Sequence, residues 1–526
     1  MPVLSGSRAA PPTRLVVFPV ALAALATASC PVVDRASHPR RDPAPAVFVK
    51  PPAAPEAPAA AALVPAALPG GDWPEPSAEQ IARLTNDATT HDRVLVALAK
   101  ETFVFERPSW GSNKIGYLRA GAIVPRGADP VGRAACAEGW YRIEPSGFVC
   151  VGRMATLDPS HPIALLSRTR ADTAQPLPYR YGMSRFPTPP FYTKLPSPNE
   201  QQRVEADLAG HRSQKRGDAW ADAPVSAIPS VLENGHQLPM PNGEFHGEAS
   251  LYSGRAMVKS GFALLDVYDD GGRKFGLSVD LDLMPLDRLE PVQPSAFQGL
   301  ELDAERSLPV AFIRQKGATL YAGHPQRGLR AERVLAYREP IALGAGHVSS
   351  GGIAYLETRD GHWLRDENLT IVPPMSKRPG WAAPGRTWID ISILRQSLVA
   401  YEGERPVYVT LVSTGADGLG DPTETHSTIR GQFLIHTKHV TATMSGDELG
   451  DEFDLRDVPY VQYFTEGYAL HAAYWHESFG RPRSHGCVNL SPVDARWLFQ
   501  WTDPPVPENW HGAMSLREGT LVYIHP

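Results

Sequence analysis

Short apolar runs separated by turn-forming residues recur from about residue 93 to the C-terminus, and this pattern most limits what the chain can fold into. Early in the stretch, runs such as VLVALA and TFVF lie between turn signals such as RPSWGSN and EPSG. Similar alternation returns at 309–372 and again from about residue 380. Runs of this length bounded by Gly, Pro and Asn are typical of antiparallel strands. The sequence therefore predicts a mainly β, multidomain protein with few helices.

The composition is that of a globular protein. The 526 residues, 42% apolar and 21% charged, leave room for about three or four domains. A net charge of -6 does not favour nucleic acid as a partner, because nucleic-acid binders usually carry a basic domain. Downstream of the N-terminus, no apolar stretch approaches the ~18 residues that a membrane span requires.

The first 30 residues have the features of an export signal. Two arginines and no acidic residue precede the apolar run LVVFPVALAALATAS, which ends at Cys30. Such a segment is typical of a signal peptide, so residues 1–30 are predicted to direct export. The residues before Cys30 resemble a bacterial lipobox, which implies acylation of its thiol after cleavage. Cleavage by the ordinary signal peptidase is the alternative.

Residues 31–78 contain twelve prolines and many alanines. Such a segment favours extended, polyproline-like conformations rather than a packed core. We expect it to act as a tether that holds the folded part away from an anchor. The signal, the Cys30 lipid anchor and this linker predict a location in the periplasm or cell envelope, with the membrane as a partner.

Residues 93–156 are predicted to form a small barrel of about five strands. The order of ERPSWGS, GYLRAGA and GWYRIEPSGFVCV resembles a bacterial SH3-like domain. Cys136 and Cys150 flank GWYRIEPSGFV, and in an exported protein we expect them to pair as a disulfide. Two separate reduced thiols are the alternative.

A second module of the same kind is predicted at 305–374, where YLETRDGHWLRDENL parallels the aromatic-rich end of the first. The region between them, 170–300, has no assigned function. Within it, QQRVEADLAGHRSQ is expected to form one helix and MVKSGFALLDVYD a strand.

The C-terminal region, 380–526, opens with WIDISI, SLVAYEG and PVYVTLVSTG, which predict a meander of antiparallel strands. Its one clear helix follows the cysteine of SHGCVN. Ser491 is a suitable N-cap, Pro492 a suitable first helical residue, and Asp494 stands at the third position of a capping-box-like start. The helix is expected to stop at TDPPVP.

Cys487, in SHGCVN, has four competing interpretations. With Cys136 and Cys150 paired and Cys30 acylated or removed, it is a leftover thiol in an exported protein, which indicates reactivity. The alternative without a chemical role is a buried cysteine that only contributes to packing. A metal site would use Cys487 with the three ligands His471, His476 and His485. We predict that the protein uses no metal and no cofactor.

Interpreting Cys487 as a nucleophile accounts for more of the residues around it than the other interpretations do. A nearby histidine can take the thiol proton, lower the thiol pKa and stabilise the charge. The backbone N–H groups of Gly486 and Cys487 could point at a developing oxyanion. His476 is expected to be a partly exposed loop histidine without a role.

His471, sixteen positions before Cys487, and the run SHGCVN together resemble the signature of the L,D-transpeptidase catalytic domain. This resemblance implies a β-sandwich-like fold and a cysteine enzyme acting on peptidoglycan stem peptides. It implies that Cys487 is the nucleophile and His471 the general base. The implied supporting positions are Ser484, His485, Gly486 and Asn489.

The resemblance implies acyl transfer through a thioester. The sequence does not decide the acceptor, which could be a second stem peptide, a lysine of an envelope protein, or water. Water as the acceptor would make the protein a carboxypeptidase or hydrolase. A non-catalytic wall-binding lipoprotein is the alternative from another class.

Overall fold

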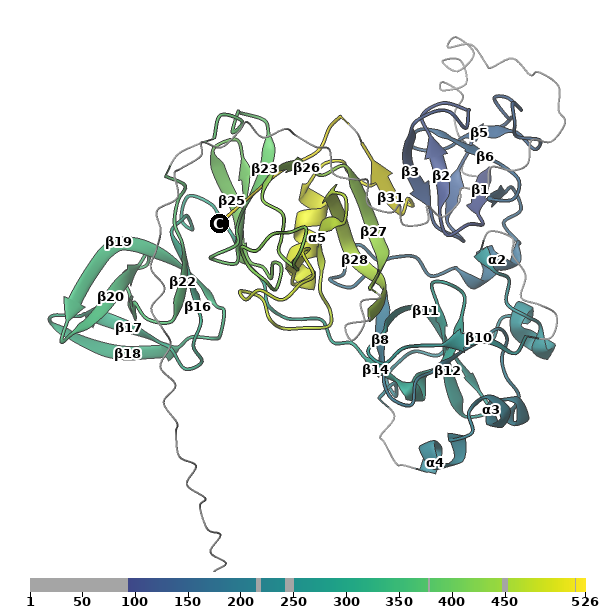
Figure 1. The fold of residues 1–526 in the computed structure, drawn as a ribbon, viewed down its shortest axis with the longest axis horizontal. Helices are drawn as coiled ribbons and strands as arrows, with labels where there is room; N and C mark the ends of the chain where they lie inside the picture. Colours follow the sequence, from purple (N-terminus) through teal and green to yellow (C-terminus); the bar gives the residue numbers. More distant parts are fainter. Residues whose placement is uncertain (1–92, 214–218, 242–249, 377–378, 447–452, 516) are drawn as a thin grey trace, which may run out of the picture. The chain divides into compact units, whose positions relative to one another are not determined.

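The computed structural model describes residues 93–213, 219–241, 250–376, 379–446, 453–515 and 517–526. All of the described residues belong to one compact unit, Ala67–Pro526. The predicted signal peptide, Cys30 and the 31–78 linker lie outside the described residues. The described part is mainly β with few helices (Figure 1), which confirms the predicted fold class. Among its helices, none is long and apolar enough to cross a membrane.

Residues 94–156 form short strands around their own core, which includes Leu95, Val104 and Ile143. The strands are β1 (Val94–Ala97), β2 (Thr102–Phe105), β3 (Lys114–Leu118), β4 (Ile123–Pro125), β5 (Trp140–Arg142), β6 (Phe148–Cys150) and β7 (Ala155–Thr156). β4, β1 and β7 make one sheet, and the other four join a longer sheet. A disulfide links Cys136 and Cys150. Cys136 lies in the loop before β5 rather than on a strand. The likeness to SH3-like domains stays a prediction.

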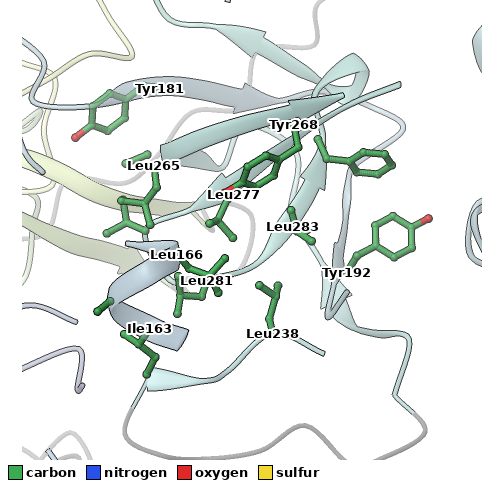
Figure 2. Close-up of a cluster of buried hydrophobic side chains, with 14 of the residues drawn as sticks. Ile163, Leu166, Tyr181, Tyr192, Leu238, Leu265, Tyr268, Leu277, Leu281 and Leu283 are labelled. Atoms are coloured by element: carbon green, nitrogen blue, oxygen red, sulfur yellow. The ribbon is translucent and has the colours of Figure 1, made fainter. Parts of the chain in front are cut away.

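The region that the sequence left unassigned has a hydrophobic core that it shares with Val458 and Ala469 of the C-terminal region. Figure 2 shows part of this core, in which Leu265, Leu277 and Leu283 lie near Tyr268. Its strands are β8 (Arg180–Ser184), β9 (Pro190–Tyr192), β10 (Tyr252–Arg255), β11 (Gly261–Asp270), β12 (Arg273–Ser278), β13 (Leu283–Pro285) and β14 (Leu289–Pro291). The next strand, β15 (Leu300–Glu301), pairs with Tyr408 and Val409 of the C-terminal region. The helical segments of the unassigned region are α3 (Pro198–Val204), α4 (Leu208–Ser213), η1 (Ser230–Gly235) and η3 (Leu286–Arg288). Helix α2 (Pro162–Leu166) precedes the region.

The prediction of one helix across QQRVEADLAGHRSQ is wrong, because the helix breaks between α3 and α4. Glu205 lies at this break and is 1% exposed. Its carboxylate accepts hydrogen bonds from Arg273 and Arg288, which are also buried. A buried carboxylate is stable only when it is paired, so these tertiary ion pairs override the local helical pattern. The predicted strand in MVKSGFALLDVYD is present as β11.

Residues 310–372 form one seven-stranded sheet in the order β18-β17-β21-β20-β19-β16-β22. The strands are β16 (Val310–Ile313), β17 (Thr319–His324), β18 (Gly328–Val334), β19 (Pro340–Ser350), β20 (Ile353–Thr358), β21 (Trp363–Arg365) and β22 (Leu369–Val372). Ile313, Leu335 and Leu364 belong to its core. Val310 and Phe312 instead share a second core with Trp388 and Phe479 of the C-terminal region. This shared core packs the sheet against the C-terminal region.

The C-terminal region contains two sheets and one helix around a common core. The first sheet contains the predicted meander of β23 (Thr387–Ser392), β24 (Ser397–Glu402) and β25 (Arg405–Leu411), together with β26 (Gly431–Leu434) and β32 (Leu521–His525). The second contains β27 (Thr437–Gly446), β28 (Phe453–Thr465), β29 (Tyr468–Ala472), β30 (Val488–Leu490) and β31 (Gly512–Met514). Ile389 and Leu398 from the first sheet pack with Leu470 and Leu490 from the second and with Leu498 from the helix.

Figure 1 shows the helix of this region, α5 (Pro492–Trp501). It begins as predicted, because the Ser491 side chain accepts a hydrogen bond from the Asp494 N–H. The Asp494 carboxylate does not complete a capping box. It is buried and accepts from the Gly299 N–H and from the hydroxyls of Tyr408 and Thr410. Asp494 thus links the segment around Gly299, called the strap below, and strand β25 to the helix that follows the cysteine motif.

Candidate active site

Cys487 and His471 lie on one face of two neighbouring parallel strands. β29 and β30 pair with Leu470 opposite Val488 and His471 opposite Asn489. Leu470, Ala472, Val488 and Leu490 all belong to the core between the sheets. Side chains alternate along a strand, and paired residues point the same way. The side chains of His471 and Asn489 therefore point to the face opposite this core. Cys487, two residues before Asn489, shares that face and packs against the other core with Ala469.

The geometry around His471 fixes the proton on its ring. The side chain is 2% exposed, and Nδ1 lies 3.1 Å from the carbonyl oxygen of Ala472. A carbonyl can only accept, so Nδ1 carries the proton and Nε2 is left as an acceptor. Burial lowers the pKa of His471 to about 4, against the smaller opposing effect of the Ala472 bond. The ring also stacks on Trp475, with 5.8 Å between centroids. His471 is therefore a neutral, oriented base near pH 7.

Cys487 is the free cysteine of the described residues. Its Sγ lies 3.7 Å from the carbonyl oxygen of Gly467. The residue is partly exposed, and desolvation by the surrounding protein raises the pKa of its thiol to about 11. The N–H of Ala469 opposes that rise. The expected lowering of the thiol pKa by histidine is not seen in the resting site, because desolvation raises this pKa and only the Ala469 N–H opposes it. The thiol can become a nucleophile only by passing its proton to a base.

The turn before Cys487 is held by Ser484. Its Oγ accepts a hydrogen bond from the Gly486 N–H at 3.1 Å and donates one to the Cys487 carbonyl. In the resting structure Ser484 therefore engages the Gly486 N–H, and the role of this N–H as an oxyanion donor stays a prediction. Gly486 has φ +125°, and a Cβ there would lie 2.9 Å from Tyr468, so the position requires glycine. The Cys487 N–H remains as the other predicted donor.

His485 lies at the rim of the site. It is exposed, and its ring centroid is 4.6 Å from that of His426 and 5.0 Å from that of Phe453. The loop carrying His426 also bonds the motif, because the Ala416 N–H donates to the Ser484 carbonyl. In addition, the Thr428 hydroxyl donates to the Gly486 carbonyl at 2.7 Å. The sequence analysis missed His426, since no local pattern relates residue 426 to residue 485.

His476 was expected to have no role, yet it contacts Asn489. Its Nε2 lies 2.9 Å from the side-chain amide of Asn489, and its Nδ1 accepts from the Ser478 N–H at 3.1 Å. The spacing of five residues from His471 was the only signal in the sequence. The proposed metal ligands do not meet: His476 faces Asn489, whereas His485 faces His426. Within the described ranges, no group of three or more His, Cys, Asp or Glu side chains is arranged to hold a metal ion.

A cavity of about 510 Å³ lies elsewhere in the described part. Its lining includes Arg119, Tyr179, Gln500 and His511, none of which belongs to the cysteine motif. The candidate site is accordingly defined by side-chain geometry on the β29–β30 face.

Comparison with known proteins identifies this region. Residues 386–524 match the model of the YkuD family, described as the L,D-transpeptidase catalytic domain. Over 171 residues the chain is 24% identical to the protein named "Putative L,D-transpeptidase YciB" from Bacillus subtilis (strain 168), covering 26% of this chain and 76% of that protein.

Two solved structures are similar over a comparable part of the chain. An L,D-transpeptidase crystal structure from Xylanimonas cellulosilytica is 26% identical, with TM-score 0.20, covering 28% of this chain and 65% of that one. An L,D-transpeptidase from Mycobacterium smegmatis is 21% identical, with TM-score 0.22, covering 31% of this chain and 72% of that one. The chain thus spans slightly less than two thirds of the first structure. On the family match, residues 386–524 are an L,D-transpeptidase catalytic domain of the YkuD family.

Proposed function

We propose that the protein is a cysteine-dependent L,D-transpeptidase that transfers acyl groups of peptidoglycan stem peptides through a thioester on Cys487. The geometry that carries this proposal places His471 on β29 and Cys487 directly before the neighbouring strand β30, and a proton on Nδ1 of His471 leaves its Nε2 as an acceptor. A thiol of raised pKa and a neutral imidazole on the same strand face are suited to attack with general-base assistance. The family match of residues 386–524 supports the choice of substrate class.

In the proposed reaction, the Cys487 thiol gives its proton to Nε2 of His471 as sulfur attacks the donor carbonyl. The bond between the L-centre and the D-residue then breaks, and the His471 proton goes to the leaving amine. An acceptor amine attacks the thioester, releases the cross-linked product and restores the thiol through His471. A second stem peptide, a lysine of an envelope protein, or water could serve as acceptor, so L,D-carboxypeptidase or hydrolase activity is the alternative outcome.

We further propose that the chain is exported and works in the periplasm or cell envelope. The support is the sequence of residues 1–30, the Cys30 lipobox-like site and the linker at 31–78. In this proposal Cys30 is acylated and gives a membrane anchor, and the modules at 93–156 and 305–374 are SH3-like. The Cys136–Cys150 disulfide is compatible with an oxidising compartment.

A non-catalytic wall-binding protein is the second candidate. The observation that favours it is the raised pKa of Cys487, which keeps the resting thiol protonated near pH 7. Under this candidate the modules at 93–156 and 305–374 would bind the wall, and the C-terminal region would be a scaffold.

The test uses the purified full-length chain with disaccharide-tetrapeptide muropeptides and a Cys487→Ala control, with products identified by mass spectrometry. Transpeptidation predicts a dimer that has lost one terminal D-residue, absent in the control. A tripeptide alone would make water the acceptor. No product, together with binding to intact sacculi, would refute the enzyme proposal for this substrate and support the wall-binding candidate.

A further inference from the structure

His476 forms a hydrogen-bonded bridge between its own loop and Asn489. Its Nδ1 accepts from the Ser478 N–H at 3.1 Å, and its Nε2 faces the Asn489 amide at 2.9 Å. The ring packs against Phe479, with 5.2 Å between centroids. Both ring nitrogens are therefore engaged, and the ring is held next to Asn489 of β30.

These contacts fix the direction of the bond to Asn489. A nitrogen that accepts from a backbone N–H carries no proton of its own, so a neutral His476 has its proton on Nε2. Burial lowers the pKa of His476 to about 3, with smaller contributions from Arg483, His471 and Arg338 in the same direction, so the ring is neutral near pH 7. Nε2 is thus a donor, and the amide atom facing it acts as the acceptor.

Only the oxygen of an asparagine amide can accept, and amide oxygen and nitrogen are assigned from their hydrogen-bond partners. The Asn489 side chain is 3% exposed, and its other terminal amide atom has no hydrogen-bond partner among the described residues. With the oxygen bonded to His476, that second atom is the NH₂ group. It is a buried donor pair on the strand face shared by His471 and Cys487.

A buried donor without a partner is costly to maintain, and it is useful where a substrate supplies an acceptor. The candidate site needs such a donor, because Ser484 occupies the Gly486 N–H. We propose that His476 is a positioning residue that orients the Asn489 amide so that its NH₂ group donates to the carbonyl oxygen of the acyl donor bound at Cys487. This inference rests on the proposed acyl transfer at Cys487.

Two substitutions separate the two bonds of His476. His476→Asn keeps an acceptor for the Ser478 N–H but is too short to reach Asn489. His476→Gln places an amide donor near the position of Nε2 but gives up the Ser478 bond. Asn489→Ala removes the amide, and the double variant His476→Asn/Asn489→Ala tests whether His476 acts through it. His324→Asn is the matched control, because His324 also accepts a backbone N–H two residues on, from Gln326 at 3.2 Å.

Three rates are measured on each full-length variant: transpeptidation of tetrapeptide muropeptides, release of 4-nitrophenol from 4-nitrophenyl acetate, and alkylation by iodoacetamide. In the second reaction sulfur forms a thioester with the acetyl group and 4-nitrophenolate leaves, so an oxyanion develops. Alkylation also needs the thiolate but forms no oxyanion. Melting temperature reports folding.

The expected result is a loss of about tenfold or more in kcat for both acyl reactions in His476→Asn and Asn489→Ala, since one lost oxyanion donor costs ~10²–10³ in kcat. The double variant should be no worse than Asn489→Ala, His476→Gln should stay within a few-fold of the unmodified protein, and alkylation rates should be unchanged. The His324→Asn control should behave as the unmodified protein.

Unchanged acyl rates in a folded His476→Asn, full additivity in the double variant, or an equal loss in alkylation would each overturn the inference. If His476→Asn does not fold, His476→Gln and Asn489→Ala still decide it, because a tenfold loss in the former or none in the latter contradicts it. If the unmodified protein does not turn over muropeptides, the proposed function fails, while the 4-nitrophenyl acetate rates still test the role of His476.

Discussion

Nδ1 of His471 lies 3.1 Å from the carbonyl oxygen of Ala472, the next residue on strand β29. The acceptor is a backbone atom of the strand that carries the base, so the ring orientation is set by the sheet itself. The opposite nitrogen is therefore presented on the face of Cys487 without help from a carboxylate. This arrangement makes the proton state of the pair a consequence of burial, and the first two predictions follow from it.

The rate of Cys487 alkylation should rise with pH across the neutral range. Burial raises the pKa of the thiol to about 11 and lowers that of His471 to about 4. Between these values both groups are neutral, and the thiolate fraction grows about tenfold per pH unit below the thiol pKa. Iodoacetamide rates measured from pH 6 to 10 should therefore increase steadily. A rate that is already flat at pH 6 to 8 would instead indicate a thiolate–imidazolium pair.

Replacing His471 by alanine should abolish most of the acyl transfer while sparing the thiol. General-base assistance contributes ~10²–10⁴-fold, so kcat with muropeptides should fall in that range. Alkylation at pH 10, where solvent hydroxide competes as a base, should change far less. A kcat within threefold of the unmodified protein would mean that another group accepts the thiol proton.

Local chemistry made part of this structure predictable. Helix α5 starts where Ser491 and Pro492 place it, because an N-cap side chain and a fixed φ act within one turn. The meander β23–β25 follows from alternation alone. His471 and Cys487 were identified from the spacing and neighbours that resemble one family signature.

The features that the sequence did not reveal depend on contacts between distant residues. Glu205 leaves its helix because Arg273 and Arg288 reach it across more than sixty positions. Asp494 turns away from its capping box to three donors that lie 84 to 195 residues before it. The raised pKa of the thiol depends on which residues cover Cys487. The sequence around the SHGCVN motif does not show which residues these are.

Gly486→Ala should damage the site more than its backbone angle alone explains. Both Gly486 and Gly467 have positive φ, but a Cβ at 486 would lie 2.9 Å from Tyr468, whereas a Cβ at 467 meets nothing within 4 Å. Gly467→Ala is thus the control for strain, expected to destabilise the fold by about 1–3 kcal/mol. Gly486→Ala should show a similar or larger loss in chemical denaturation together with reduced acyl transfer. Equal activity in the two variants would argue against a tight turn at 486.

Asp494→Ala should destabilise the C-terminal region strongly, even though Asp494 lies outside the proposed chemistry. Its carboxylate is fully buried and accepts from the Thr410 hydroxyl at 2.6 Å, the Tyr408 hydroxyl at 2.7 Å and the Gly299 N–H at 2.8 Å. Alanine would leave these three donors without a partner, each costing about 1–3 kcal/mol unless water enters. A loss of about 2–5 kcal/mol in the unfolding free energy is therefore expected by urea denaturation followed through tryptophan fluorescence.

Asp494→Asn is the matched variant. Its amide oxygen can still accept at one of the two carboxylate oxygen positions, whereas its NH₂ group takes the other position, where it faces a donor instead of accepting from it. Its loss should be smaller than that of alanine, and both variants should keep the rate of Cys487 alkylation when folded. An alanine variant as stable as the unmodified protein would show that the strap at Gly299 and strand β25 do not depend on this carboxylate. They would then be held to α5 mainly by packing, such as the stacking of Tyr408 on Trp497 with 4.1 Å between ring centroids.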